Sequence, residues 1–339
     1  MPQENVKDVL VVIPTYNEQD HIETCLRSLL NGGFERGTVI VCDGGSQDAT
    51  REIVTGLKAE FPNVELLHNE KKLQSAAINL AVSQTATSET KYLVRCDAHS
   101  IYPDHYIADI VSKLEETGAA SVVTAMDSVG STCFEKANAW IVDTPLGSGG
   151  AAHRGGARSG YVDHGHHAGF NIDWFRRIGG YDETFSHNED AEYDLRLSNA
   201  GGEVYLDADI RSVYTPRGSV PGLAKQYFNY GKGRARTVLK HGVRPKIRQM
   251  LPVFAVLAIF LSLVLLPVAP VFAIIPLTYL AVLITVSLCF VLLKVSLCGL
   301  WTGPALGTMH LSWGLGFLVQ LFRNNLGQSA KMGLQQREL

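Results

Sequence analysis

The chain has 339 residues, enough for one large domain or two smaller ones. Its net charge of −3 hides two opposed regions: residues 1–210 carry 16 basic and 32 acidic side chains, and residues 211–250 carry 10 basic and no acidic ones. Residues 249–293 hold no charged side chain, about 45 positions, which suffices for two membrane helices of roughly 20 residues each. A wholly soluble protein is therefore excluded. A nucleic-acid partner for the basic stretch is disfavoured, because the adjoining membrane supplies a simpler anion.

Basic residues beside the uncharged stretch predict its orientation. Arg244, Lys246 and Arg248 lie next to the first membrane end, and such flanks stay on the cytoplasmic side. We therefore expect the polar N-terminal part on the cytoplasmic face of an inner membrane. No signal segment is expected, because the opening apolar run at residues 9–13 is too short.

The cysteines show no paired spacing, and most fall in apolar runs. Such positions are typical of buried free thiols in a reducing compartment. The six are Cys25, Cys42, Cys96, Cys133, Cys289 and Cys298.

Residues 9–13 form an apolar, β-branched run, as in a parallel strand that is covered on both faces. Pro14 should end this strand, and a helix should run from about Gln19 to Leu30. The residues between them either cap that helix or contact a ligand, and the two roles are compatible. Tyr16 is harder to explain by capping, because an aromatic side chain at a strand's carboxyl end is a natural platform for a planar base.

A second strand at residues 38–42 runs into the turn Asp43-Gly-Gly-Ser-Gln-Asp48, and residues 50–58 are predicted to be helical. A hairpin is disfavoured because a helix follows, so the two glycines more plausibly let backbone approach a ligand. The pattern is not the Gly-x-Gly-x-x-Gly fingerprint, which disfavours a dehydrogenase.

A third strand at residues 64–67 precedes Lys71, Lys72 and a helix at residues 74–83. Lys72 could meet a phosphate at the helix start, although a solvated pair of lysines is the simpler explanation. The fourth strand, from Leu93, delivers Asp97 and then His99. These two could hold a divalent cation and a diphosphate, whereas the alternative is that Asp97 caps the next turn.

Four polar segments form an ordered series, three after predicted strands and the last at a predicted helix start: Pro14-Thr-Tyr-Asn-Glu18, Asp43-Gly-Gly-Ser46 with Asp48, Asp97-Ala-His99 and Asn188-Glu-Asp190. Over roughly residues 8–240 this series resembles the motifs of family 2 inverting glycosyltransferases. Within that family it is most similar to membrane-anchored glucosyltransferases of the succinoglycan type. The resemblance implies a GT-A fold, which is an α/β fold with a Rossmann-like mixed sheet. It also implies a nucleotide-sugar donor and a divalent metal, Mg²⁺ or Mn²⁺.

By motif position the resemblance also implies residue roles. Asp190 would be the general base, with Glu189 beside it, although acidic residues are favoured at any helix N-terminus. Asp97 would hold the metal. The usual Asp-x-Asp is Asp-Ala-His here, so His99 would replace the second acidic ligand. The donor would be bound by Pro14, Thr15, Tyr16, Glu18, Asp43, Lys72 and Asp97.

Further along the chain, residues 121–126 are predicted as a strand, and the glycine-rich residues 146–156 as a mobile loop over the site. The segment Asp163-His-Gly-His-His167 suggests zinc, but closed four-ligand spacing is missing, so sugar contact or packing is preferred. Gly169 and Phe170 resemble the family's acceptor-side segment.

The basic stretch around residues 226–234 is expected to be a helix in the membrane interface. Phe228 and Tyr230 would lie in the headgroup layer, and Lys232, Arg234 and Arg236 near the phosphates of anionic lipids. Arg234 could also meet the pyrophosphate of the acceptor. A solvated basic helix is the alternative.

We expect a catalytic domain at residues 1–220, an interfacial region at 221–248 and a membrane domain at 249–339. Pro267 and Pro270 break the apolar run into spans at 251–266 and 271–293, which form a hairpin. A third apolar segment, 303–322, has basic residues beyond both ends, so we expect it to be re-entrant or interfacial.

The resemblance thus implies a hexosyltransferase that moves glucose from UDP-glucose to a polyprenyl-diphosphate-linked sugar in exopolysaccharide biosynthesis. The rival class is a non-catalytic, membrane-tethered protein that binds nucleotide sugar or lipid. Retention of Asp190 favours the enzyme. The acceptor, the linkage and the oligomeric state do not follow from the sequence.

Overall fold

The computed structural model describes residues 7–31, 34–155 and 158–335. Two compact units divide the chain. The sheet unit comprises Met1–Asp127 and Ala151–Tyr214, and the helical unit comprises Ser128–Gly150 and Thr215–Leu339. Residues 128–150, expected in the catalytic domain, thus belong with the C-terminal helices.

The sheet unit is built on an eight-stranded mixed sheet in the described part of the chain, in the order β3-β2-β1-β4-β7-β5-β8-β6. Strands β2, β1 and β4 pair in parallel, as do β3 and β2, whereas β7 is antiparallel to both β4 and β5. The strands are β1 (Val9–Thr15), β2 (Gly37–Asp43), β3 (Val64–His68), β4 (Tyr92–Arg95), β5 (Ser121–Ser128), β6 (Gly160–Val162), β7 (His167–Asn171) and β8 (Val204–Tyr214).

Helices cover both faces of this sheet, which explains the unbroken apolar runs of its central strands. Alternate residues of β1 point to opposite faces: Val11 packs with α1, α2 and α4, and Val12 packs with α3, α7 and α8. These helices are α1 (Ile22–Leu30), α2 (Thr50–Leu57), α3 (Gln74–Thr85), α4 (Tyr106–Thr117), α7 (Ile172–Arg177) and α8 (Glu189–Asn199). The predicted α/β class and the order of its elements are confirmed.

One strand end differs from the prediction. Pro14 lies inside β1, which continues to Thr15 and pairs there with Asp43 of β2. On its other side, β1 pairs with β4 only as far as Val12. Because no ladder partner on that side needs a donor at position 14, the missing N–H of proline costs nothing there.

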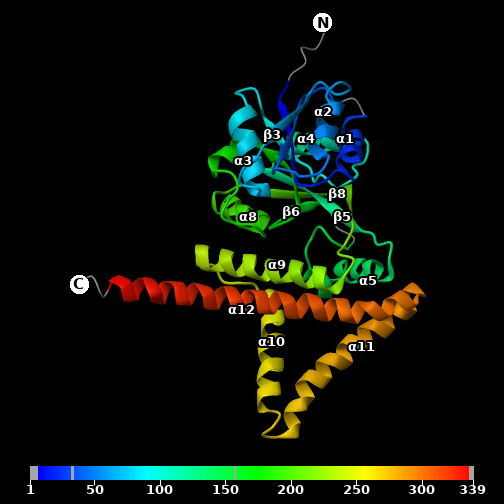
Figure 1. Cartoon of the computed structure of the whole chain (residues 1–339), viewed down its shortest axis with the longest axis vertical. Helices are drawn as coiled ribbons and strands as arrows, with labels where there is room; N and C mark the ends of the chain where they lie inside the picture. Colours follow the sequence, from blue (N-terminus) through cyan, green and yellow to red (C-terminus); the bar gives the residue numbers. More distant parts are fainter. Residues whose placement is uncertain (1–6, 32–33, 156–157, 336–339) are drawn as a thin grey trace. The chain divides into compact units, whose positions relative to one another are not determined.

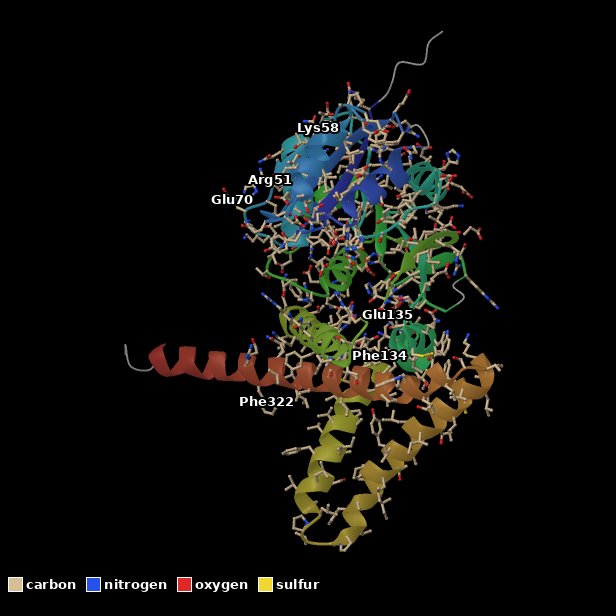
Figure 2. The ribbon with its side chains drawn as sticks, turned by 45° about the vertical axis from the view of Figure 1, so that its right-hand side comes forward. Arg51, Lys58, Glu70, Phe134, Glu135 and Phe322 are labelled. Carbon is tan, nitrogen blue, oxygen red and sulfur yellow. A yellow bond between two sulfur atoms is a disulfide. The ribbon has the colours of Figure 1, made fainter. Side chains whose placement is uncertain are left out.

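The helical unit contains two long helices that run side by side, α9 (Val220–His241) and α12 (Thr302–Gln335) (Figures 1 and 2). Helices α10 (Ile247–Leu265) and α11 (Ile274–Lys294) form a hairpin through the short η1 (Pro270–Ala273) (Figure 1). The break at Pro267 and Pro270 predicted this hairpin. The unit is completed by α5 (Cys133–Val142), α6 (Pro145–Ser148) and η2 (Leu297–Trp301).

The expectation for the cysteines of this unit is corrected. Cys133 of α5 and Cys298 of η2 form a disulfide, drawn in yellow beside the labelled Phe134 in Figure 2, and Cys289 is exposed. The prediction of six buried free thiols is therefore wrong for these three. The two bonded cysteines are 165 residues apart, and only the packing of α5 on η2, with Phe134 against Trp301, brings them together.

The segment 146–156 is not one loop over a site. Its first part lies in the helical turn α6, where the carbonyl of Leu146 is 3.0 Å from Nε2 of His310 on α12. Its later part belongs to the sheet unit, where Arg154 stacks 4.5 Å from the Tyr214 ring. Residues 156 and 157 fall outside the described residues.

Within the described residues, three helical segments are long and apolar enough to cross a membrane: 247–265, 270–294 and 297–324. Of their apolar windows, 11%, 6% and 39% respectively are buried within the protein. The third is therefore the most covered, because α12 packs along α9, and Phe322 projects from the side of α12 away from α9 (Figure 2).

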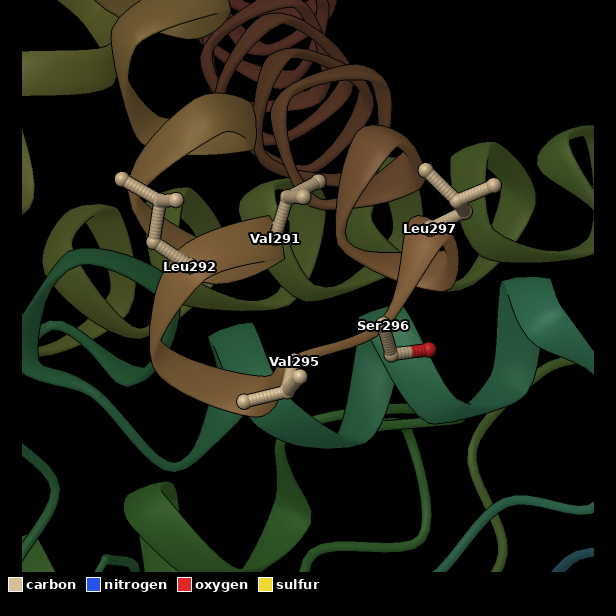
Figure 3. Close-up of a pocket in the computed structure, with 5 residues that line it drawn as sticks. All are labelled: Val291, Leu292, Val295, Ser296 and Leu297. Carbon is tan, nitrogen blue, oxygen red and sulfur yellow. The ribbon is translucent and has the colours of Figure 1, made fainter.

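A pocket at the end of α11 is lined by Val291, Leu292, Val295, Ser296 and Leu297 (Figure 3). Its lining carries no charged side chain, so we do not assign chemistry to it.

Glycines allow the backbones of α9 and α12 to touch. A Cβ added at Gly316 would collide with the carbonyl of Phe228, and one at Gly231 with that of Trp313. We expect Gly316→Ala to destabilise the helical unit by about 1–3 kcal/mol, because overpacking forces the two helices apart. Thermal unfolding of the full chain in detergent would measure this. The matched control is Gly56→Ala on α2, where a Cβ meets open space and no loss is expected. Equal midpoints for the two variants would contradict the close packing.

Candidate active site

Two loops at the carboxyl ends of β1 and β2 lock onto each other. The backbone N–H of Asn17 donates to Ser46 Oγ (2.9 Å), and Asn17 Oδ1 accepts from the N–H of Gln47 (2.8 Å). The N–H of Glu18 donates to Thr50 Oγ1 (2.8 Å). Neither Asn17 nor Glu18 caps α1, whose N-cap position is His21. The polar residues after β1 are therefore used to fix a paired loop.

Asp43 shapes the second loop from within. Its side chain is fully buried and accepts hydrogen bonds from the N–H groups of Gly45 and Ser46 and from Ser46 Oγ. The Asp43 carboxylate is enclosed by these contacts in this conformation. Asp43 fixes Gly45 at φ 80°, a backbone conformation that favours glycine.

Tyr16 and Lys72 form an exposed edge beside these loops. Tyr16 is 50% exposed, and Lys72 Nζ lies 5.8 Å from the centroid of its ring. Lys72 has φ 55°, which is uncommon for a residue with a Cβ, and its backbone lies beside Gly44. Thr15 is nearly buried, and its carbonyl accepts from the N–H of Gly44 (2.8 Å). An exposed aromatic ring and an ammonium group thus stand at one strand-end edge, as predicted from their order.

Asp97 follows β4, and its carboxylate contacts three elements. Oδ1 accepts from Gln74 Nε2 at the start of α3 (3.1 Å) and lies 3.7 Å from Arg95 Nη2, while Oδ2 is 3.3 Å from His166 Nε2. Burial opposes ionisation, but the hydrogen bond from His166 and the charge of Arg95 outweigh it and lower the pKa of Asp97 far below its usual range. Asp97 is therefore a fixed anion.

Asp190 lies on the first turn of α8. Its Oδ1 accepts from Arg95 Nη1 (2.6 Å) and from Tyr181 OH (2.8 Å), and its Oδ2 lies 3.8 Å from His166 Nδ1. Arg95 is 4% exposed; burial alone would lower its pKa, but the charge of Asp190 raises it well above the usual value. Arg95 thus bridges one oxygen of each carboxylate, and His166 bridges the other two.

A second histidine–aspartate pair connects the segment before β7 to α8. His164 Nδ1 lies 2.6 Å from Oδ2 of the buried Asp194. Asp190 and Asp194 are four residues apart and therefore share a face of α8, and His164 and His166 are two residues apart in the segment before β7. In the segment that suggested zinc, His164 contacts Asp194 and His166 faces Asp190. The side chain of His167 falls outside the described residues.

The remaining predicted residues are placed differently. His99 Nδ1 lies 3.0 Å from Glu18 Oε1. Glu189 is half-buried beside Asp190, and burial, reinforced by that neighbouring charge, raises its pKa. Phe170 is fully buried between rings of α7 and α8, and a Cβ at Gly169 would collide with Ile110. This corrects their expected contact with an acceptor, because both lie inside the sheet. Arg234 is half-buried on α9 of the helical unit.

Sequence reasoning missed Arg95, Tyr181 and Gln74. A signal for Arg95 was present, because a cation inside the apolar run Leu93-Val-Arg-Cys96 must be paired if it is buried. Tyr181 and Gln74 carried no comparable signal, since each meets its partner only through the fold.

Known proteins are similar to this chain in sequence, and others are similar to it in fold. Residues 10–179 match the family Glycosyl transferase family 2. The succinoglycan biosynthesis protein ExoA of Rhizobium meliloti (strain 1021) is 42% identical over 313 residues, which cover 92% of this chain and 94% of that protein. A Methanococcus voltae dolichyl N-acetyl-alpha-D-glucosaminyl phosphate 3-beta-D-2,3-diacetamido-2,3-dideoxy-beta-D-glucuronosyltransferase is 26% identical over 68% of this chain and 74% of its own.

Among solved structures, the mannosyltransferase PcManGT from Pyrobaculum calidifontis, in complex with GDP-Man and Mn²⁺, superposes with a TM-score of 0.59. It covers 93% of this chain and 87% of its own at 18% identity, a likeness that concerns the fold alone. Together with the motif order and the mixed sheet, these matches show that the chain belongs to glycosyl transferase family 2 and is a glycosyltransferase with a GT-A fold.

Proposed function

We propose that this glycosyltransferase is an inverting, metal-dependent hexosyltransferase that moves glucose from UDP-glucose to a polyprenyl-diphosphate-linked sugar. It would act in the biosynthesis of a succinoglycan-type exopolysaccharide. The polysaccharide class is supported by the 42% identity to the Rhizobium meliloti protein named for succinoglycan biosynthesis. The observation that carries the chemistry is the convergence of Asp97 and Asp190 on Arg95 and His166.

Inversion requires one carboxylate to take the proton of the acceptor hydroxyl while its oxygen bonds to the anomeric carbon and the bond to the donor diphosphate breaks. Asp190 is suited to this role, because Arg95 and Tyr181 hold Oδ1 and fix the direction of the carboxylate. Oδ2 would then receive the proton. Glu189 is the weaker candidate, because the hydrogen bonds from Arg95 and Tyr181 orient the Asp190 carboxylate.

The residues present fit a divalent cation that is shared with the donor. Asp97 offers a fixed anionic oxygen, and among the residues the structure describes no three His, Cys, Asp or Glu side chains could hold an ion by themselves. Such a protein shell suits Mg²⁺ or Mn²⁺, which take one or two carboxylates and complete their shell with substrate phosphates and water. When bound, the ion would stabilise the charge of the departing diphosphate.

The donor nucleotide would lie along the edge made by the first two strand ends. The exposed Tyr16 ring offers a stacking surface for the base, and Lys72 Nζ offers a cation to the phosphates. Pro14, Thr15 and Glu18 would act through the locked loops, as would Asp43, because their backbone and carboxylate contacts fix those loops.

We also propose that the helical unit anchors the protein to the membrane that carries the acceptor. Helices α10 and α11 would span an inner membrane, α9 and α12 would lie in its interface, and the sheet unit would be cytoplasmic. The basic residues that precede α10 and the cations of α9 support this orientation and contact with anionic lipid.

A donor screen tests the function. Membranes containing the full chain would be given radiolabelled UDP-glucose, UDP-galactose or GDP-mannose together with lipid-linked acceptors. We expect label to enter the lipid fraction from UDP-glucose, and the new linkage to be β, the inverted configuration. Transfer from another donor would overturn the sugar assignment, and an α linkage would overturn inversion.

Arg234 is proposed to meet the acceptor's pyrophosphate. Arg234→Gln should raise the acceptor KM by about tenfold and leave the donor KM unchanged, because a charge-assisted hydrogen bond contributes ~1.5–3 kcal/mol. Arg236→Gln, two residues further along α9 and exposed, is the matched control and should change neither constant. An equal rise for both variants would reduce Arg234 to a contributor to general surface charge.

A further inference from the structure

We propose that His166, rather than His99, is the second protein ligand of the divalent cation at Asp97. The inference rests on the proposed metal-dependent transfer and assigns a residue that the Asp-Ala-His motif does not contain. It follows from the position of the His166 ring, from the position of the His99 ring and from the support behind His166.

The His166 ring stands at the metal side of Asp97. Its Nε2 is 3.3 Å from Asp97 Oδ2. Two neighbouring ligands of one octahedral ion, each ~2.1 Å from it, are about 3 Å apart. The two atoms therefore have nearly the separation that a shared cation requires. A cation bound by both atoms would replace this direct contact.

His99 is directed elsewhere. Its Nδ1 lies 3.0 Å from Glu18 Oε1, and its side chain is 60% exposed, whereas that of His166 is 26% exposed. The backbone N–H of Glu18 is hydrogen-bonded to Thr50, so this contact places His99 beside the paired loops that follow β1 and β2. Sequence adjacency to Asp97 made His99 the expected ligand, but the fold places a different imidazole at the carboxylate.

The other nitrogen of His166 faces a carboxylate, as the second nitrogen of a metal-bound histidine commonly does. Such histidines almost always direct their second ring nitrogen to a carboxylate, carbonyl or water, which fixes the tautomer and the ring orientation. Nδ1 of His166 faces Asp190 Oδ2 at 3.8 Å, an attractive distance that is longer than a hydrogen bond. The pair His164–Asp194 holds the same segment two residues earlier. The His166 imidazole is thus held against one face of α8 before any metal binds.

This ligand set also predicts the choice of metal. An imidazole nitrogen beside one carboxylate favours Mn²⁺ over Mg²⁺, which prefers oxygen ligands. A second acidic residue, as in the usual Asp-x-Asp, lacks this preference. We therefore expect the wild-type protein to bind Mn²⁺ at least tenfold more tightly than Mg²⁺.

The test is Mn²⁺ alone, bound to the full chain in detergent without a polyhistidine tag. Electron spin-echo spectroscopy should detect nitrogen-14 coupled to Mn²⁺ in the wild type, and free Mn²⁺ counted by electron paramagnetic resonance gives the Kd. His166→Ala should lose the nitrogen coupling and raise the Kd at least tenfold. His99→Ala is the matched control and should keep the coupling with a Kd within twofold.

A third variant separates ligation from folding. His166→Asp supplies an oxygen in place of nitrogen, so it should still bind Mn²⁺, without nitrogen coupling, and should narrow the preference for Mn²⁺ over Mg²⁺. Persistence of the coupling in His166→Ala, its loss in His99→Ala, or its absence from the wild type would each overturn the proposal. Because no nucleotide sugar is used, a failed donor screen with an intact nitrogen signal would reject the donor assignment and leave this inference standing.

Discussion

Asp190→Asn should lower kcat by about 100- to 10,000-fold, the usual contribution of a general base. The asparagine carbonyl can still accept from Arg95 and Tyr181, so the side chain should keep its place. What is lost is the oxygen that takes the acceptor's proton. Initial rates in membranes with saturating donor and lipid-linked acceptor measure the effect, and donor Kd should stay within a few-fold because the donor is held by other residues.

Glu189→Gln is the matched control, one residue away on the same helix turn. It should keep transfer within about tenfold, since Glu189 is not held by the Arg95 and Tyr181 contacts that orient Asp190. The opposite pattern, with Glu189→Gln inactive and Asp190→Asn active, would move the base to Glu189.

Arg95→Met should be the most destabilising single substitution at this site. It removes a buried cation from between Asp97 and Asp190 and leaves two half-buried carboxylates with His166 as their remaining bridge. Breaking a buried ion pair in this way typically costs ~3–5 kcal/mol. In a domain of this size that loss lowers the thermal midpoint by about 10 °C, measurable by differential scanning fluorimetry of the full chain in detergent.

Arg27→Met provides the comparison, because Arg27 also bridges two carboxylates, Glu23 and Glu60, but at the surface. Water and salt screen exposed pairs, so the midpoint should fall by no more than a few degrees. Similar shifts for Arg27→Met and Arg95→Met would mean that burial adds nothing to the pairing at Arg95.

The sequence by itself determined the elements whose signals are local. The apolar run at residues 9–13 predicted a strand covered on both faces, and β1 packs against two layers of helices. The motif order placed Tyr16, Asp97 and Asp190 at strand ends and a helix start, because polar residues after buried strands collect at one sheet edge. The uncharged stretch broken at Pro267 and Pro270 predicted a helical hairpin, and α10 and α11 form it.

Only the tertiary structure decided which of these residues meet. Arg95 and Asp190 are 95 positions apart, and no local pattern specifies that pair. The sequence puts His99 beside Asp97, whereas the fold brings His166 to its carboxylate, in a segment that the His164–Asp194 contact holds against α8. Cys133 and Cys298 meet because α5 packs on η2. In each case a side chain's partner is set by packing between elements distant in sequence, which periodicity and composition do not encode.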